Sequence, residues 1–354
     1  MIKKTNSTVT VDLSKLTTNI DSLEEHIQEG TRIMAVVKAD AYGHGATEVA
    51  AHIENRVGGF AVNDIQEGIE LREHGITKPI LVFAVPEKAS ASQYRVHNLT
   101  ATVSAFEHFN WLPNGTSFHL NFDTGMGRLG FLPDEAEKIS ALISDHPTLF
   151  CTGIYSHFAT ADTPSSEQVL EQQSIFKEIR SYFSDELATH IANTGATAFY
   201  DTKQFNMVRL GIGLYGYPPG KQEIPGISPV LDWQSRLVQV KKVAKKNSVS
   251  YGANWTAPRS GNLGIIPVGY DDGLKRSLSD KIKVRIEGNI YNVVGTITMN
   301  YCMVYLDGDY YEPGTAVELL YDKNDATDWA SSIDTIPYEI LTSINPKIRR
   351  NYEN

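Results

Sequence analysis

The sequence predicts an α/β protein, a (β/α)8 TIM barrel followed by a mostly antiparallel β domain. Between Ile33 and Gly216, about eight short apolar runs alternate with amphipathic segments, and eight strands close such a barrel. Beyond Tyr217-Pro218-Pro219-Gly220 the pattern changes to alternating stretches rich in β-branched residues, which is typical of antiparallel strands. An open doubly wound sheet remains the alternative for the first part, because a strand count made from one sequence is easily wrong by one.

The apolar runs of the first part are short and continuous, as strands buried on both faces are. Helical spacing marks two of the intervening segments, Asp64–Gly75 behind an Asp cap and Ser165–Phe183 behind serine caps. Alternation of strands and helices implies parallel pairing. The predicted strands are Ile33–Lys38, Gly59–Asn63, Pro79–Ala84, Thr100–Ser104, Phe118–Asp123, Phe150–His157, His190–Asn193 and Phe205–Arg209.

The second part begins after a predicted linker at 225–229, so we expect domains at 10–225 and at 226–354 together with 1–9. Pro337–Ile344 predicts a short helix, and Arg349 and Arg350 lie in a tail behind it. The strands expected here, separated by turn residues, are Ser235–Val243, Gly264–Val268, Lys281–Ile286, Ile290–Ile297 and Cys302–Leu306.

Composition excludes several classes of protein. Hydrophobic residues make up 41% of the 354 residues and charged residues 21%, values typical of a globular protein. A net charge of -10 disfavours nucleic acid as a partner. Cys151 and Cys302 show neither a disulfide pattern nor a metal-ligand spacing, so we expect no metal site. No apolar run approaches the roughly 20 residues of a membrane span, so we expect a cytoplasmic protein, associated with a membrane only through an upstream domain outside this sequence.

The stretch from Ala35 to Gly45 places a lysine at the end of an apolar run, with a tyrosine and two glycines behind it. An amine such as that of Lys38 forms a Schiff base with an aldehyde, and the glycines let backbone N–H groups approach an anion. This combination suits a carbonyl cofactor that carries a phosphate. The alternative is a cation that ends a strand before an ordinary turn.

Further reactive side chains fall at the ends of other predicted strands, where barrel enzymes carry their chemistry. Thr194 and the amides of Gly211 and Ile212 suit a phosphate. Taken singly, the arginines could form surface ion pairs, the histidine could lie in the core, and the threonine could cap a helix. The residues at this rim are Lys38, Asp123 leading to Arg128, His157, Asn193-Thr194 and Arg209-Leu210-Gly211.

Several motifs occur in order over nearly the whole chain: Val37–Gly45, Asp123–Gly130, Ser156–Ala159, Val208–Gly211 with Leu214–Gly216, Val249–Gly252 and Gly269–Gly273. Together they resemble the alanine racemase family. The resemblance implies pyridoxal phosphate as the cofactor, a TIM barrel with an appended β domain, a small amino acid as substrate, and a head-to-tail homodimer with shared active sites.

The resemblance also implies roles for single residues. Lys38 would bind the cofactor and act as the base on one face of the substrate α-carbon. Tyr270, from the partner subunit, would serve the opposite face, because racemisation needs a proton-transfer group on each face or one mobile base. His157 would hydrogen-bond Tyr270 and be coupled to Arg209.

Other roles follow from the same resemblance. Arg209 would face the pyridine nitrogen and keep it unprotonated. Arg128 would meet the phenolic oxygen of the cofactor and the substrate carboxylate, to which the Met299 amide would also donate. The phosphate would be lined by Tyr42, Asn193, Thr194, Gly211, Ile212 and Tyr338.

Two positions depart from the family pattern. Asn121 stands where the family often has a carbamylated lysine that orients the arginine corresponding to Arg128, so either an anion such as chloride or the Asn oxygen alone must do this. Asn300 stands where a carboxylate is usual, near the substrate entrance. The amide could admit a side chain with a hydroxyl, as in the similar racemase domain of the vancomycin-resistance membrane serine racemases, or it could be a neutral change that leaves alanine preferred.

The expected function is therefore interconversion of the L and D forms of alanine, serine or both by a lysine and tyrosine pair, supplying a D-amino acid for peptidoglycan precursors. A non-catalytic pyridoxal phosphate-binding protein, a decarboxylase of related fold and a sugar-phosphate barrel enzyme without pyridoxal remain alternatives. The β domain motifs argue against the first, and the reaction products or the absence of colour would identify the other two.

Overall fold

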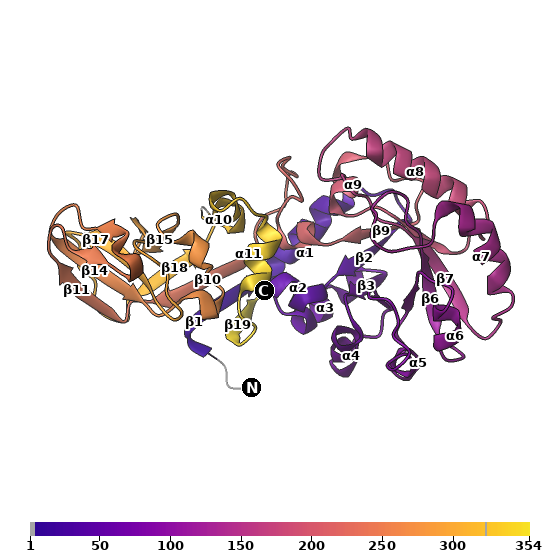
Figure 1. Cartoon of the computed structure of the whole chain (residues 1–354), viewed down its shortest axis with the longest axis horizontal. Helices are drawn as coiled ribbons and strands as arrows, with labels where there is room; N and C mark the ends of the chain where they lie inside the picture. The colour runs from indigo at the N-terminus through magenta and orange to yellow at the C-terminus, as the bar shows by residue number, and fades with distance from the viewer. Residues whose placement is uncertain (1–3, 323) are drawn as a thin grey trace. The chain divides into compact units, whose positions relative to one another are not determined.

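The structure, a computed structural model, describes residues 4–322 and 324–354, and these form two compact units (Figure 1). The barrel unit comprises Leu16–Ala41 and Ala46–Ser228, and the sheet unit comprises the described part of Met1–Lys15 together with Tyr42–Gly45 and Pro229–Asn354. The domain boundaries inferred from the sequence, 10–225 and 226–354 with 1–9, stay a prediction.

Eight parallel strands, all within the described barrel unit, form two four-stranded sheets of order β4-β3-β2-β9 and β5-β6-β7-β8. Hydrogen bonds join the sheets at both seams: Thr100 N donates to Ile80 O (2.8 Å), and Arg209 N donates to Ala192 O (2.9 Å). The predicted barrel is therefore confirmed. Its strands are β2 (Arg32–Val36), β3 (Gly59–Val62), β4 (Ile80–Val82), β5 (Ala101–Val103), β6 (Ser117–Asn121), β7 (Phe150–Tyr155), β8 (Ala188–His190) and β9 (Met207–Leu210).

Helices α3 to α8 lie outside the ring of strands (Figure 1). The predicted Asp64 cap is present, since its Oδ1 accepts from Gln66 N (2.9 Å) and Glu67 N (3.1 Å). Ser166 precedes α8 without a side-chain cap and instead hydrogen-bonds Thr160. The helices are α1 (Leu13–Glu24), α2 (Lys38–Gly43), α3 (Ala46–Ile53), α4 (Ile65–Glu73), α5 (Ser92–Val96), α6 (His108–Trp111), α7 (Ala136–Ile143), α8 (Glu167–Arg180) and α9 (Thr194–Phe199).

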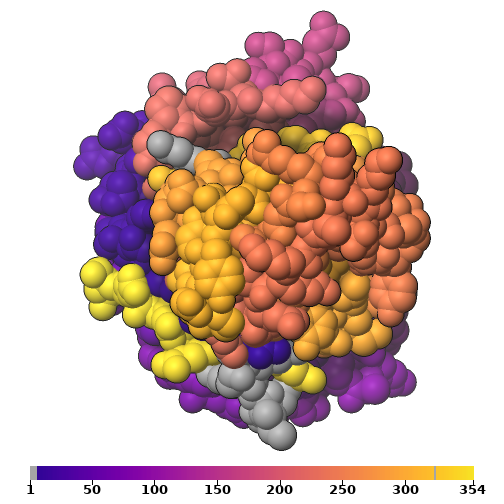
Figure 2. All heavy atoms as spheres, turned by 90° about the vertical axis from the view of Figure 1, so that its left-hand side faces the viewer, coloured from indigo at the N-terminus to yellow at the C-terminus, as the bar shows by residue number. Residues whose placement is uncertain are grey.

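The described part of the sheet unit contains a six-stranded sheet of order β16-β15-β18-β10-β1-β19 and a three-stranded sheet of order β11-β14-β17. Their pairs are antiparallel except for β1 with β19. Figure 2 shows one face of this unit, where the residues between β10 and β17 are orange. Its elements are β1 (Lys4–Asp12), β10 (Leu231–Arg236), β11 (Gln239–Val243), β12 (Ser248–Val249), β13 (Trp255–Thr256), β14 (Gly261–Ile266), β15 (Lys283–Ile286), β16 (Asn289–Asn292), β17 (Cys302–Asp307), β18 (Ala316–Leu320), α10 (Ala326–Ser332), α11 (Pro337–Ser343) and β19 (Ile348–Glu353).

Two expectations for the sheet unit were wrong. The single strand predicted at Ser235–Val243 is two strands, because β10 and β11 belong to different sheets. The expected tail at Arg349 and Arg350 is strand β19, which pairs in parallel with β1. Its charged residues hide the strand pattern, and its partner lies at the other end of the sequence.

Candidate active site

The segment after β2 is a left-handed helical turn. Ala39, Asp40, Ala41 and Tyr42 have φ angles of 54, 54, 52 and 54°, a conformation that costs about 1–2 kcal/mol for each non-glycine residue. Tertiary hydrogen bonds hold it: Ala39 N donates to Glu67 Oε1 (2.6 Å), and Ala46 N donates to Asp40 Oδ1 (2.9 Å). The turn places Lys38 at the carboxyl end of β2, as the sequence predicted.

The Lys38 amine is half-buried among cations and an aromatic ring. Its Nζ lies 5.9 Å from the centroid of the Phe83 ring. Burial lowers the pKa of Lys38, Arg128 and Arg209 lower it further, and Glu67 opposes the shift. A lowered pKa increases the neutral fraction of the amine, which is the nucleophilic form.

Arg209, on β9, is buried with a relative exposure of 3%. Its Nη1 donates to Nδ1 (2.9 Å) and O (3.0 Å) of His190. Its Nη2 donates to Ser156 O (2.9 Å), His157 Nδ1 (2.9 Å) and Ile191 O (3.2 Å). Burial lowers the pKa of Arg209 to about 10, so the guanidinium is still a cation at neutral pH, held by acceptors from two neighbouring segments, 156–157 and 190–191.

The histidines around Arg209 have defined protonation states. A guanidinium only donates, so His157 and His190 accept at Nδ1 and carry their proton at Nε2. His190 Nε2 then donates to His119 Nδ1 (2.8 Å). Burial first and Arg209 next lower the pKa of His157 to about 3, and burial, Arg32 and Arg209 lower the pKa of His119 to about 3. These imidazoles are therefore neutral at pH 7.

The ends of β8 and β9 meet at Thr194. Its Oγ1 accepts from Gly211 N (3.1 Å) and Gly213 N (3.5 Å). Asn193 caps α9 by accepting from Ala196 N (3.0 Å). A Cβ on Gly213 would lie 2.6 Å from Thr194 Cγ2, so glycine permits this close approach. Ile212 opens the adjoining 3-10 turn Ile212–Tyr215, and such first-turn amides lack acceptors within their own helix.

Arg128 lies in a turn that follows β6. Asp123 Oδ1 accepts from the amides of Gly125, Met126 and Gly127 (2.9, 2.9 and 3.1 Å). The Arg128 side chain is exposed, yet its charge lowers the pKa of Lys38 and of His157. Asn121, at the end of β6, is buried. What replaces the carbamylated lysine of the family at this position stays a prediction.

The sheet unit holds the other residues expected from the sequence. Tyr42 is buried, and its ring centroid lies 5.8 Å from that of Tyr338, with the ring planes at 53°. Burial raises the pKa of Tyr42, with Tyr338 adding to the shift. The structure therefore brings together two of the tyrosines predicted to line a phosphate.

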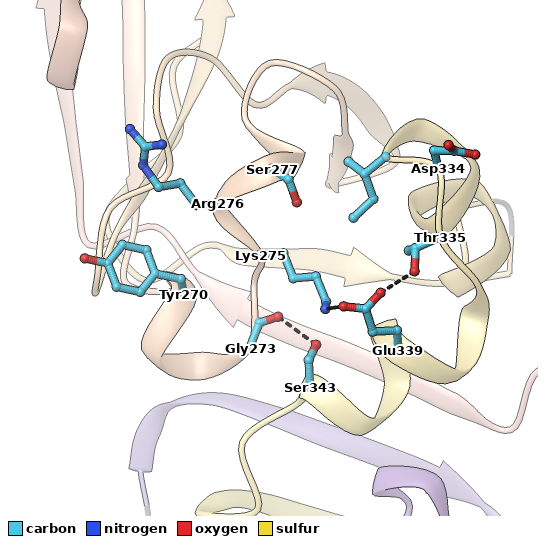
Figure 3. Close-up of a pocket in the computed structure, with 10 residues that line it drawn as sticks. Tyr270, Gly273, Lys275, Arg276, Ser277, Asp334, Thr335, Glu339 and Ser343 are labelled. Atoms are coloured by element: carbon cyan, nitrogen blue, oxygen red, sulfur yellow. Dashed lines mark hydrogen bonds and ion pairs between the residues drawn. The ribbon is translucent and has the colours of Figure 1, made fainter. Parts of the chain in front are cut away.

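Tyr270 and Met299 share one corner of the sheet unit. Tyr270 N donates to Thr298 O (3.1 Å), and Asp271 N donates to Met299 O (3.0 Å). Asn300, next along the chain, is exposed. Figure 3 shows Tyr270 at one side of a pocket of about 580 Å³, where Lys275 is ion-paired with Glu339.

Tyr251 is a candidate that the sequence motif contained but to which no role was assigned. Its side chain is 73% exposed, against 43% for Tyr270. Ser250 and Ala253 have φ angles of 67 and 49°. Ser250 Oγ donates to Thr296 O (2.6 Å), and Thr296 Oγ1 donates to Tyr251 O (2.8 Å). A strained, firmly held backbone that displays an exposed phenol is typical of a functional site.

The described residues, 4–322 and 324–354, contain no group of three His, Cys, Asp or Glu side chains placed to hold a metal ion. Of the helices in the same part, none is both long enough and apolar enough to cross a bilayer.

The donor set at the barrel rim fits pyridoxal phosphate. The cofactor needs an amine for its aldehyde, N–H and O–H donors for its phosphate and a partner for its ring nitrogen. The ends of β2, β8 and β9 carry Lys38, the Thr194 and Gly211 cluster, and the buried Arg209.

Comparison with known proteins agrees with this chemistry. Residues 11–219 match the N-terminal domain of alanine racemase, and residues 230–352 match its C-terminal domain. The chain is 37% identical to an alanine racemase of Geobacillus kaustophilus over 97% of this chain and 93% of that protein. It is 35% identical to one of Lactococcus lactis over 98% of each chain.

Solved structures give the same result. An alanine racemase of Clostridium difficile 630 superposes with a TM-score of 0.93 at 31% identity, over 99% of this chain and 96% of that one. An alanine racemase of Bacillus anthracis with bound L-Ala-P superposes with a TM-score of 0.91 at 30% identity, again over 99% and 96% of the two chains.

Proposed function

The chain belongs to the alanine racemase family, and from that premise we propose that it interconverts L- and D-alanine with pyridoxal phosphate as its cofactor. The single observation that carries the proposal most directly is the half-buried Lys38 amine at the rim that also holds the buried, cationic Arg209. An amine with a lowered pKa beside a fixed cation is what binding and activating an aldehyde cofactor requires.

Most of the cofactor is held by the barrel rim. Lys38 would bond its aldehyde, Arg209 would donate to its ring nitrogen, and Thr194 with the amides of Gly211 and Ile212 would bind its phosphate. Asn193, Tyr42 and Tyr338 complete the proposed phosphate site. When bound, the cofactor withdraws electrons from the substrate α-carbon and so makes its proton removable. Because Arg209 stays charged and only donates, it would keep the ring nitrogen of a bound cofactor unprotonated.

Of the two ways to racemise, one mobile base or a group on each face, we propose the second: Lys38 serves one face of the α-carbon and another group the opposite face. Two groups of the barrel unit are poorly suited to this. Tyr155 is buried and hydrogen-bonded to Thr102, and burial raises its pKa to about 12. His157 accepts from Arg209 and has a pKa near 3, so it is a weak base. The second group is therefore an exposed phenol of the sheet unit.

Tyr251 is our candidate for this phenol, in preference to the Tyr270 expected from the sequence. Tyr251 is the more exposed of the two, and its main chain is pinned by Thr296. Tyr270 remains a proposed part of the substrate entrance, together with Met299 and Asn300. We propose that a second copy of the chain supplies this phenol, in a homodimer with shared sites. In that dimer Arg128 binds the substrate carboxylate.

A direct test uses the purified chain loaded with pyridoxal phosphate. We expect a yellow protein whose colour is fixed by borohydride and lost in Lys38→Ala, and which removes the circular dichroism of L-alanine without releasing carbon dioxide. Colour without racemisation would support a binding protein, and carbon dioxide release would support a decarboxylase. A colourless protein would refute the proposed cofactor.

A further inference from the structure

Glu67 links the beginning of α4 to the segment that carries Lys38. Its Oε2 accepts from Asn63 N (2.6 Å) and Asp64 N (3.4 Å), which completes the capping box of α4. Its Oε1 accepts from Ala39 N (2.6 Å), the amide directly after Lys38. A capping residue needs only the first set of bonds, so the bond to Ala39 requires a separate explanation.

The amide of Ala39 begins the left-handed turn. Four successive non-glycine residues there have positive φ angles, so the turn exists because surrounding groups hold it. Glu67 supplies the bond at the first of these positions. Amide hydrogen bonds to a carboxylate are short and strong, and the 2.6 Å distance is of this kind.

The charge of Glu67 also acts near the amine. The charged groups whose fields shift the pKa of Lys38 are Arg128 from the turn after β6, Arg209 from β9 and Glu67 from α4, and of these Glu67 alone is negative among the described residues. The neutral His157 also lies within the electrostatic reach of Lys38.

We propose that Glu67 is a positioning residue for Lys38, fixing the left-handed turn through the Ala39 amide and balancing the cations around the amine. This inference rests on the proposed function, in which Lys38 is the reacting amine. The proposed action of Glu67 runs through the Ala39 amide and through its charge near the amine.

The test uses the full chain freed of pyridoxal phosphate, with ¹³C at the lysine Cε. NMR titration gives the pKa of Lys38, whose resonance is identified by its loss in Lys38→Ala, and hydrogen exchange reports on the Ala39 amide. Glu67→Gln removes the charge at nearly constant shape. Glu70→Gln, an exposed position on the same helix, is the matched control. Glu67→Asp keeps the charge and shortens the reach, and it serves as the second variant should Glu67→Gln fold poorly.

In Glu67→Gln we expect the pKa of Lys38 to fall by roughly one unit and the Ala39 amide to exchange roughly tenfold faster, with neither change in Glu70→Gln. In Glu67→Asp we expect faster exchange at Ala39 with the pKa of Lys38 near that of the parent chain. A Lys38 pKa that is unchanged or raised in Glu67→Gln, or an unchanged Ala39 exchange rate, overturns the inference. Both readouts need no turnover, so they stand apart from a failure of the proposed racemase activity.

Discussion

Arg209 in the barrel unit and Tyr251 in the sheet unit differ in their exposure to solvent and in how their side chains are held. Arg209 is 3% exposed and donates to acceptors on two segments of its own unit. Tyr251 is 73% exposed on a backbone with positive φ angles around it. The Arg209 guanidinium is thus fixed by hydrogen bonds within the barrel unit, whereas the Tyr251 phenol lies open to solvent.

This contrast indicates how the two halves of the proposed chemistry are divided. Groups that must keep a constant charge, such as Arg209 and the neutral His157, are fixed by hydrogen bonds within one chain. The phenol proposed to exchange a proton with substrate, that of Tyr251, is instead 73% exposed. Substitutions in each unit test this difference.

The largest effect is expected at Lys38. Lys38→Ala removes both the cofactor bond and one proton-transfer group, so kcat for racemisation of L-alanine should fall by about a thousandfold or more. Lys177→Ala, at an exposed position on α8, should leave kcat unchanged. Substantial activity in Lys38→Ala would show that Lys38 and the groups beside it at the barrel rim serve another purpose.

The next largest effect decides between the two exposed tyrosines. We expect Tyr251→Phe to lower kcat by about 10²–10⁴-fold, since it removes a proton-transfer group, and Tyr270→Phe to lower it by less than about tenfold. Racemisation rates from both enantiomers provide the measurement. If Tyr270→Phe has the larger effect, Tyr270 is the second proton-transfer group, as the family resemblance implies.

Mixing two inactive variants tests whether sites are shared. When Lys38→Ala and Tyr251→Phe chains are unfolded together and refolded, random pairing should make about one quarter of all sites complete, because half the dimers are hybrid and each hybrid has one intact site. Activity of the mixture, compared with each variant refolded alone, is the readout. No recovery would place both groups in the same chain.

A smaller effect concerns the pH dependence of stability. His119 and His157 have a pKa near 3 in the folded chain and about 6.5 when unfolded. The unfolded chain therefore binds more protons between these values, and stability present above pH 6.5 is lost as the pH falls towards 3. Each histidine should lower the free energy of unfolding by about 1.4 kcal/mol at pH 5.5.

Urea unfolding at pH 7.5, 6.5 and 5.5 measures this change in the free energy of unfolding. His74→Gln, which alters an exposed histidine, should leave the slope unchanged, and a flat profile in the parent chain would contradict the buried neutral assignment.

The smallest effect is expected at Asn300. If its amide favours a hydroxyl side chain, Asn300→Asp should lower the ratio of kcat/KM for L-serine to that for L-alanine by several-fold, at most about tenfold. The serine preference itself stays a prediction. A parent chain that favours L-alanine by more than about a hundredfold would reject it.

The barrel was predictable because each strand is a short apolar run bounded by turn residues, and Asp64 is a cap whose chemistry is local. The left-handed turn was not predictable, since alanine, aspartate and tyrosine do not favour positive φ and only contacts such as Glu67 with Ala39 impose it. Strand β1 was missed because polar residues dominate its sequence. The resemblance included the motif around Tyr251. The exposure of the Tyr251 side chain and the positive φ angles beside it are known only from the structure.

The pairing of β1 with β19 has a consequence for biosynthesis. Val9 lies opposite Arg350 and Val11 opposite Tyr352, so β1 receives one of its two neighbours only after the residues of β19, Ile348–Glu353, have been translated. A chain released before residue 348 keeps β10 beside β1 but leaves the other edge bare, and an uncovered edge invites aggregation. The parallel pair thereby distinguishes a chain that carries β19 from one that lacks it.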